Sequence, residues 1–250
     1  MSFCELRYFS NALQVNTAAR VILPETGEPP YPTLYLLHGL SDDESMWTRR
    51  TSIERYVADL PLIVVMPNGG RGFYLDAAEG FRYAAAIGDE LPRRIEETFP
   101  AKRERGGRAL AGLSMGGHGA LQIALSRPND FCAAASLSGA VGFGHYPENR
   151  DGAPYSPEFR RILGAGDPAG SAADVWHHAA TLAPESLPAL RIDCGTEDFL
   201  IAHNRAFHAF LEEKRVAHEY VEYPGAHDWP YWDAHIQDVL KFLRPVLGLP

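Results

Sequence analysis

Short, continuously apolar runs that alternate with helix-like segments constrain the fold of this 250-residue chain most strongly. Such a run fits a strand that is buried on both faces, and strands that alternate with helices favour a parallel sheet covered on both sides. The sequence therefore predicts an α/β fold built on a twisted, mostly parallel sheet. The five runs are TLYLLHG at 33–39, LIVVMPN at 62–68, RALAGL at 108–113, AAASLSG at 133–139 and ALRIDCG at 189–195.

The N-terminus and one long internal segment depart from this rhythm. Apolar residues at 3–9 and 14–23 flank a polar turn, which predicts an antiparallel strand pair that opens the fold. Residues 140–188 are rich in Gly, Pro, Ala and Ser, so we expect a loop-rich, cap-like excursion within a single domain over 1–250. Pro92 should kink the second of five helical patterns, which cover 52–60, 82–98, 115–126, 201–214 and 231–244.

Composition and charge exclude several classes of partner. Apolar residues make up 46% of the chain, and the net charge is −9, from 23 basic and 32 acidic residues. A nucleic-acid partner is not expected, because phosphate binding needs a basic face. No run of 18 apolar residues and no export-like N-terminus is present, so we expect neither a membrane partner nor secretion, and a cytoplasmic location.

No cofactor or metal is expected from the sequence. The three cysteines, Cys4, Cys132 and Cys194, are odd in number and widely spaced, as is typical of reduced thiols. No histidine, cysteine or carboxylate cluster has the spacing of metal ligands along the chain.

The segment ALAGLSMGGHGAL at 109–121 carries the clearest chemical signal. Gly112, Ser114 and Gly116 form the pattern G-x-S-x-G between a predicted strand and a predicted helix, which is the context of a nucleophile elbow. Such a turn raises the serine hydroxyl into the open and points a helix N-terminus at the site. The pattern alone also fits an ordinary tight turn, so a base and an acid must support it.

A serine nucleophile needs a histidine base and a carboxylate that orients it, and these should follow in the order Ser, Asp or Glu, His. His227 fits the base because it follows a strand pattern that ends in Pro224-Gly225, ahead of the last helix. Asp198 fits the acid, with Glu197 second, because both lie in the turn after the run at 189–195. Asp198 also fits a simple helix cap.

Two backbone amides are expected to bind the oxyanion of an acyl-transfer reaction. Met115 directly follows the serine, and Leu40 lies in the loop after the run at 33–39. His38 is then a structural hydrogen-bonding residue beneath this loop. Six residues in or near carboxyl-end loops are candidates for the pocket wall, although such residues also serve packing: Trp47, Arg71, Tyr74, Phe143, Trp176 and Trp229.

Seven separated segments, which occur in the order given at the end of this paragraph, resemble the esterase D-like α/β-hydrolases. The resemblance covers nearly the whole chain and is greatest to the tributyrin esterases of that group. S-formylglutathione hydrolases, feruloyl and acetyl xylan esterases and mycolyltransferases are more distant relatives. The segments are YFSNALQVNTAARVILPE, LLHGLSDDESMWTRRTSIERY, VVMPNGGRGFY, LAGLSMGGHGALQIAL, AAASLSGA, CGTEDFL and PGAHDWPYW.

The resemblance implies an α/β-hydrolase fold and a serine carboxylesterase with the triad Ser114, Asp198 and His227 and the oxyanion donors Leu40 and Met115. It also implies small ester substrates with short acyl chains, such as tributyrin-like or acetylated-sugar esters. Some members of the group form oligomers, so a homo-oligomer is compatible with it. The alternatives are a thioester hydrolase of the S-formylglutathione type, acyl transfer to an alcohol, and a non-catalytic binding protein of the same fold.

Overall fold

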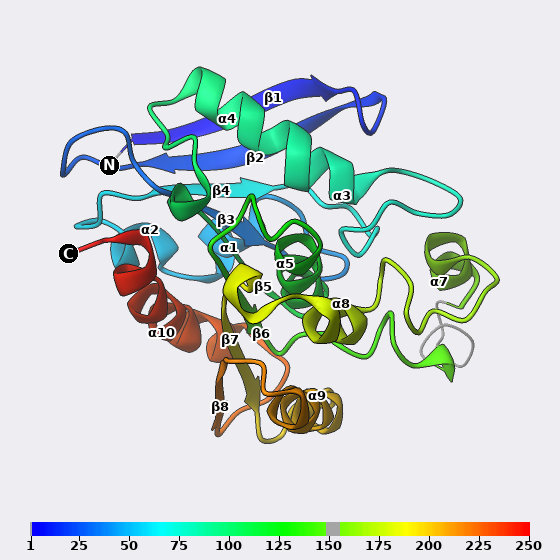
Figure 1. Ribbon diagram of the computed structural model, residues 1–250. Coiled ribbons are helices and arrows are strands. Elements are labelled where there is room, and N and C mark those ends of the chain that lie inside the picture. Colours follow the sequence, from blue (N-terminus) through cyan, green and yellow to red (C-terminus); the bar gives the residue numbers. More distant parts are fainter. Residues whose placement is uncertain (1, 149–155) are drawn as a thin grey trace.

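The computed structural model describes residues 2–148 and 156–250, and these residues form an eight-stranded sheet (Figure 1). The spatial order is β1-β2-β4-β3-β5-β6-β7-β8; β1 and β2, and β2 and β4, pair antiparallel, and the other neighbours pair parallel. The predicted α/β fold with an antiparallel N-terminal pair is confirmed. The strands are β1 (Ser2–Ser10), β2 (Val15–Leu23), β3 (Thr33–Leu37), β4 (Ile63–Pro67), β5 (Arg108–Leu113), β6 (Ala133–Leu137), β7 (Ala189–Gly195) and β8 (Glu219–Tyr223).

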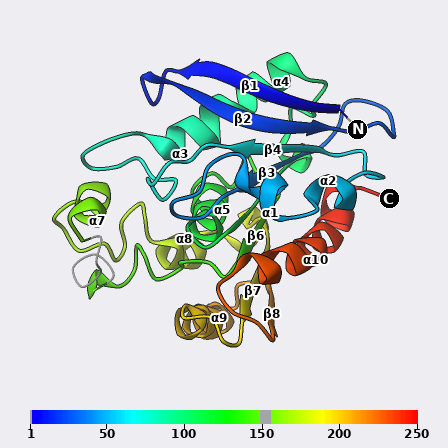
Figure 2. The same ribbon diagram turned by 180° about the vertical axis from the view of Figure 1, so that it is seen from behind.

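The central strands are buried on both faces, as their unbroken apolar runs predicted. In β3, Leu34 and Leu36 belong to one hydrophobic cluster, whereas Tyr35 and Leu37 belong to a second cluster on the opposite face. Figures 1 and 2, which view the molecule from opposite sides, both show α2 beside α10. The first cluster includes residues of α1 (Met46–Arg50), α2 (Ile53–Tyr56) and α10 (Trp229–Leu247), and the second includes residues of α4 (Leu91–Thr98), α5 (Met115–Ser126), α7 (Ser156–Leu163), α8 (Val175–Thr181) and α9 (Ile201–Lys214).

The disturbance expected at Pro92 takes the form of a wide helical turn. Helix α3 (Tyr83–Ala85) runs into a π-helical turn (Ala86–Glu90), which continues into α4. Proline lacks an N–H donor and its ring crowds the preceding turn, and a π-helical turn relieves that crowding without ending the helix. Two short 3₁₀ turns, Arg105–Gly107 and Pro184–Ser186, precede β5 and β7.

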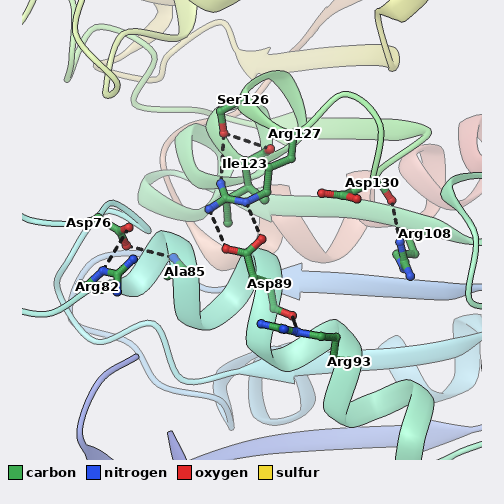
Figure 3. Close-up of polar contacts among 10 residues, drawn as sticks. All are labelled: Asp76, Arg82, Ala85, Asp89, Arg93, Arg108, Ile123, Ser126, Arg127 and Asp130. Atoms are coloured by element: carbon green, nitrogen blue, oxygen red, sulfur yellow. Dashed lines mark hydrogen bonds and ion pairs between the residues drawn. The ribbon is translucent and has the colours of Figure 1, made fainter. Parts of the chain in front are cut away.

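An ion pair joins the π-helical turn to the C-terminal end of α5 (Figure 3). Arg127 donates from Nε and Nη2 to the two carboxylate oxygens of Asp89, at 3.1 Å in each case. The Arg127 side chain is 19% exposed and that of Asp89 is 43% exposed. The pair therefore fixes one end of α5, the helix whose other end begins directly after Ser114.

The segment between β6 and β7 corresponds to the predicted excursion at 140–188, of which 149–155 lie outside the described residues. It carries α7 and α8, and Trp176 of α8 packs against Phe207 and Phe210 of α9. Among the residues that the structure describes, no helix combines the length and the apolar character needed to cross a bilayer.

The sheet topology brings the candidate catalytic residues to one edge. Because β3, β5, β7 and β8 run parallel, the loops that follow them emerge at the same side of the sheet. These loops carry Leu40, Ser114, Asp198 and His227.

Replacing Asp89 by alanine should destabilise the fold, because Arg127 would lose its two hydrogen bonds to a carboxylate. We expect a loss of about 1–2 kcal/mol of unfolding free energy, discounted for the exposure of Asp89. Urea unfolding followed by circular dichroism measures this change. Asp59→Ala, at an exposed position, should change the unfolding free energy by less than about 0.5 kcal/mol. Equal effects of the two substitutions would contradict the structural role of the ion pair.

Candidate active site

Ser114 occupies a sharp turn between β5 and α5. Its backbone has φ 52° and ψ −116°, a conformation that side-chain-bearing residues rarely adopt. The neighbouring glycines permit the close approach of chain segments around it: a Cβ on Gly116 would lie 2.5 Å from the carbonyl oxygen of Leu37, and one on Gly112 would lie 2.5 Å from the carbonyl of Gly116. The G-x-S-x-G pattern therefore forms the strained turn that a nucleophile elbow requires.

A continuous chain of hydrogen bonds links Ser114 to two residues from other strand ends. His227 Nε2 lies 2.9 Å from Ser114 Oγ, and His227 Nδ1 lies 2.8 Å from Asp198 Oδ2. Because the carboxylate can only accept, Nδ1–H donates to Asp198, and Nε2 accepts the serine hydroxyl proton. The imidazole is thereby held in the tautomer that can act as a general base.

Asp198 combines the two roles that its sequence position allowed. Oδ2 faces His227, while Oδ1 accepts from the Leu200 amide at 2.8 Å just before α9. Burial alone would raise the pKa of this carboxyl, but the hydrogen bonds from His227 and Leu200 outweigh it and hold the pKa below its usual value. The group therefore stays ionised at neutral pH.

The other carboxylates near this site have structural partners. Glu197 accepts from the Gly225 amide at 2.6 Å and so ties the β7 loop to the loop that carries His227. Asp228 caps α10 by accepting from the Tyr231 amide at 3.1 Å. Of these neighbours, Asp198 is the one hydrogen-bonded to the imidazole.

Aromatic rings surround the His227 imidazole. Trp232 packs edge-on against it with ring centroids 5.0 Å apart, and Phe199 lies 4.5 Å away on the outer side. The His227 side chain is 16% exposed. These contacts limit rotation of the ring away from Ser114.

The loop after β3 lies directly against the serine. A Cβ on Gly39 would be 3.7 Å from Ser114 Cβ, and Leu40 and Met115 line the same cavity as Ser114. Buried His38 holds this loop: its Nε2 accepts from the Gly69 amide and its Nδ1–H donates to the Gly39 carbonyl, both at 2.8 Å. Burial lowers the pKa of His38, which keeps the ring neutral for this arrangement.

The cavity at Ser114 has a volume of about 180 Å³. Of the six residues suggested for the pocket wall, Phe143 lines this cavity. The others have different surroundings. Buried Trp47 donates to the Leu37 carbonyl and packs against Trp229 on the α10 face of the sheet.

The remaining three of the six also make contacts of their own. Arg71 forms a bidentate ion pair with Glu158. The Tyr74 hydroxyl donates to the His38 carbonyl, and Trp176 Nε1–H donates to the Val141 carbonyl.

Most of the cavity wall was not anticipated from the sequence. Phe73 stacks on Phe143 with ring centroids 3.5 Å apart, and Phe159 of α7 packs edge-on against both rings. For Phe199 the sequence held one signal, its position directly after Asp198; in the structure this side chain is 76% exposed. The wall residues that were not expected there from the sequence are Phe73, Ala140, Gly142, Phe159, Phe199, Leu200 and His203.

A larger cavity, of about 570 Å³, lies over the C-terminal half of α5 and is lined by residues that include Gln122, Ser126 and Arg127. Ser114, Asp198 and His227 are not among its lining residues. The smaller cavity is therefore the candidate active site, because Ser114 lines it.

Comparison with known proteins identifies relatives of the whole chain. The model of a family described as putative esterases matches residues 10–243. An acetyl esterase of Caldicellulosiruptor saccharolyticus is 28% identical over 98% of this chain and 99% of its own length.

Two solved structures from Staphylococcus aureus show the same likeness. The fluorophosphonate-binding serine hydrolase F is 30% identical, covers 97% of this chain and 98% of that one, and has a TM-score of 0.85. An S-formylglutathione hydrolase is 31% identical with the same coverage and a TM-score of 0.83. The chain therefore belongs to the esterase family and, as its resemblance to the esterase D-like α/β-hydrolases predicted, is a carboxylic ester hydrolase.

Proposed function

We propose that the protein is a serine carboxylesterase that hydrolyses small esters with short acyl chains through an acyl-enzyme on Ser114. The observation that carries this proposal is the hydrogen-bonded chain from Ser114 through His227 to the ionised Asp198. The elbow conformation and the adjacent Leu40 and Met115 amides support it, because acyl transfer needs donors at the developing oxyanion.

The proposed reaction follows from these positions. His227 Nε2 takes the hydroxyl proton as Ser114 Oγ forms a bond to the ester carbonyl carbon, and the carbonyl oxygen becomes an oxyanion at the two amides. His227 then gives that proton to the alkoxide leaving group, so the alcohol departs and the acyl group stays on Ser114. Water attacks the acyl-enzyme with the same base, which releases the carboxylic acid and restores the serine.

The size of the cavity supports a short acyl group. A cavity of about 150 Å³ holds a benzene molecule, which has six heavy atoms. The cavity at Ser114, about 180 Å³, thus suits an acetyl to butyryl group, whereas a long acyl chain would need further space. Its wall includes Phe73, Phe143 and Phe159, which favours an apolar acyl chain.

A thioester hydrolase of the S-formylglutathione type is the second candidate, because the 31% identical structure carries that name. The same three residues would perform the acyl transfer, so the proposed triad does not separate the two functions. The ratio of kcat/KM for S-formylglutathione to that for p-nitrophenyl acetate and butyrate does. A ratio well above one would favour the thioester, and acetylated sugars in the same series test the natural alcohol.

Ser114→Ala should lower kcat for p-nitrophenyl butyrate by about 10⁴-fold or more, because it removes the nucleophile. The same variant should lose labelling by a fluorophosphonate probe, which attacks an activated serine. Ser126→Ala, at the other end of α5, serves as the matched control and should keep both properties. Labelling of a serine other than Ser114 would assign the nucleophile to that residue. No labelling of the wild-type chain would overturn the assignment and favour a non-catalytic binding protein.

Asp198→Asn should reduce kcat by about 10³-fold or more, because an amide in place of the carboxylate no longer holds Nδ1–H or stabilises the imidazolium. Glu197→Gln tests the alternative acid next to it and should stay within about tenfold of the wild type. Steady-state kinetics with p-nitrophenyl acetate compares the two variants. A larger loss in the Glu197 variant would transfer the orienting role to that residue.

Phe143→Leu should shift the acyl-chain preference toward longer esters, since a smaller side chain opens the cavity beside Ser114. We expect the ratio of kcat/KM for p-nitrophenyl hexanoate to that for the acetate to rise about tenfold. Phe81→Leu, at an exposed ring outside this cavity, should leave the ratio unchanged. An unchanged ratio in the Phe143 variant would show that the acyl chain binds elsewhere.

A further inference from the structure

A second group of chemically active side chains lies at the end of α9 that is far from Asp198. His208, Glu212 and His218 each offer one potential ligand atom, and these atoms all lie within 4.8 Å of one another. We propose that these three residues bind a divalent transition-metal ion, in the first place Zn²⁺. This site is separate from the ester-hydrolysing machinery and does not depend on the proposed function.

The local fold explains why the three side chains meet. His208 and Glu212 are four residues apart in α9, so they share one face of the helix. The helix ends at Arg215, whose left-handed conformation reverses the chain, and the Val216 amide then donates to the Leu211 carbonyl at 2.9 Å. This turn returns His218 alongside the last turns of α9, just before β8.

The hydrogen bonds of His218 direct the lone pair of its Nε2 toward His208. His218 Nδ1 lies 2.7 Å from the Val216 carbonyl, so Nδ1–H donates and Nε2 carries the lone pair. That lone pair faces His208 Nδ1 at 2.8 Å, which in the metal-free protein places one proton between the two rings. A metal ion would be bound by His208 Nδ1 and His218 Nε2 once the proton of His208 moves from Nδ1 to Nε2, so that both rings stay neutral. The Val216 carbonyl already fixes the tautomer of the other ligand, His218.

The distances require only small side-chain movements. Tetrahedral Zn²⁺ with bonds near 2.0–2.1 Å separates its ligand atoms by roughly 3.3 Å. The two imidazole nitrogens must therefore part by about 0.5 Å, and Glu212 Oε1, now 4.0 Å from His218 Nε2, must move closer. The Glu212 side chain is 67% exposed and is therefore able to move, while the fourth coordination position would be taken by water.

The surroundings hold the two imidazoles in place before a metal arrives. The His208 ring stacks on Tyr220 of β8 at 4.2 Å with an interplanar angle of 7°, and the His218 side chain is 1% exposed. Two imidazoles and one carboxylate suit Zn²⁺ and its neighbours in the transition series, whereas Ca²⁺ and Mg²⁺ require mostly oxygen ligands. The donor set thus selects the class of ion.

Spacing along the chain gave no reason to expect a metal site, because it does not show that the turn at Arg215 brings His218 back to His208.

The structure also suggests what an ion would do there. Asp198 precedes α9 and His227 follows β8, so a metal at these three residues would connect the two elements that flank the acid and the base. It would do so at the C-terminal end of α9 and the N-terminal end of β8, which are the ends far from Asp198 and His227 in the sequence.

Isothermal titration of the tag-free, EDTA-treated protein with ZnCl₂ tests the proposal directly. We expect one high-affinity Zn²⁺ per chain, at least about tenfold weaker binding in His208→Ala and His218→Ala, and weaker binding in Glu212→Gln. Co²⁺ as a spectroscopic probe should give the intense visible absorption of a tetrahedral site in the wild type. His235→Ala is the matched control, since His235 also lies on a helix and pairs with a carboxylate, that of Asp238.

Thermal unfolding supplies a second readout that does not depend on activity. At Zn²⁺ concentrations of about a hundred times the Kd, the wild-type Tm should rise by about 5 °C, and exposed Glu212→Gln, which is not expected to affect folding, should show a smaller rise. Binding that persists unchanged in both histidine variants, a Zn²⁺ effect equally reduced in His235→Ala, or no binding by the wild type would overturn the proposal.

Discussion

The structure at the candidate active site depends on one chain of hydrogen bonds between residues that are far apart in the sequence. Ser114 and His227 are 113 residues apart, and His227 and Asp198 are 29 residues apart. Their side chains meet because each follows a strand of the same parallel sheet, whose register sets where each loop begins. The packing of the sheet, rather than any local motif, therefore brings the His227 imidazole within hydrogen-bonding distance of Ser114.

Two features of this hydrogen-bonded chain of residues are unfavourable by themselves. Ser114 has a strained backbone, and Asp198 keeps its charge in a buried position. The surrounding structure compensates for both. The strand before Ser114 and the helix after it are packed in the core, and Asp198 receives hydrogen bonds from His227 and from the Leu200 amide. A rigid scaffold thus holds a reactive geometry ready before substrate binds.

The excursion between β6 and β7 shapes the cavity at Ser114, which is the proposed site of the acyl group. Phe143 and Phe159 both come from this segment, and they complete a wall with Phe73 from the loop after β4. Loops that tolerate sequence change can in this way alter substrate size while the hydrogen-bonded chain stays constant. The proposed metal site involves different elements. It would join the C-terminal end of α9 to the start of β8, whereas Asp198 precedes α9 and His227 follows β8.

The sequence by itself determined the class of fold and singled out the candidate residues for the chemistry. Unbroken apolar runs indicate strands that are buried on both faces. Ser114, Asp198 and His227 each follow a predicted strand, which predicts that they lie at one edge of a parallel sheet. Only the tertiary structure decided which aromatic residues face the cavity and which pack elsewhere. Trp47 and Phe143 both belong to apolar surroundings, but they lie on opposite faces of the sheet. The meeting of His208 with His218 was likewise set by a chain reversal, because contacts across a turn depend on backbone geometry that residue spacing does not encode.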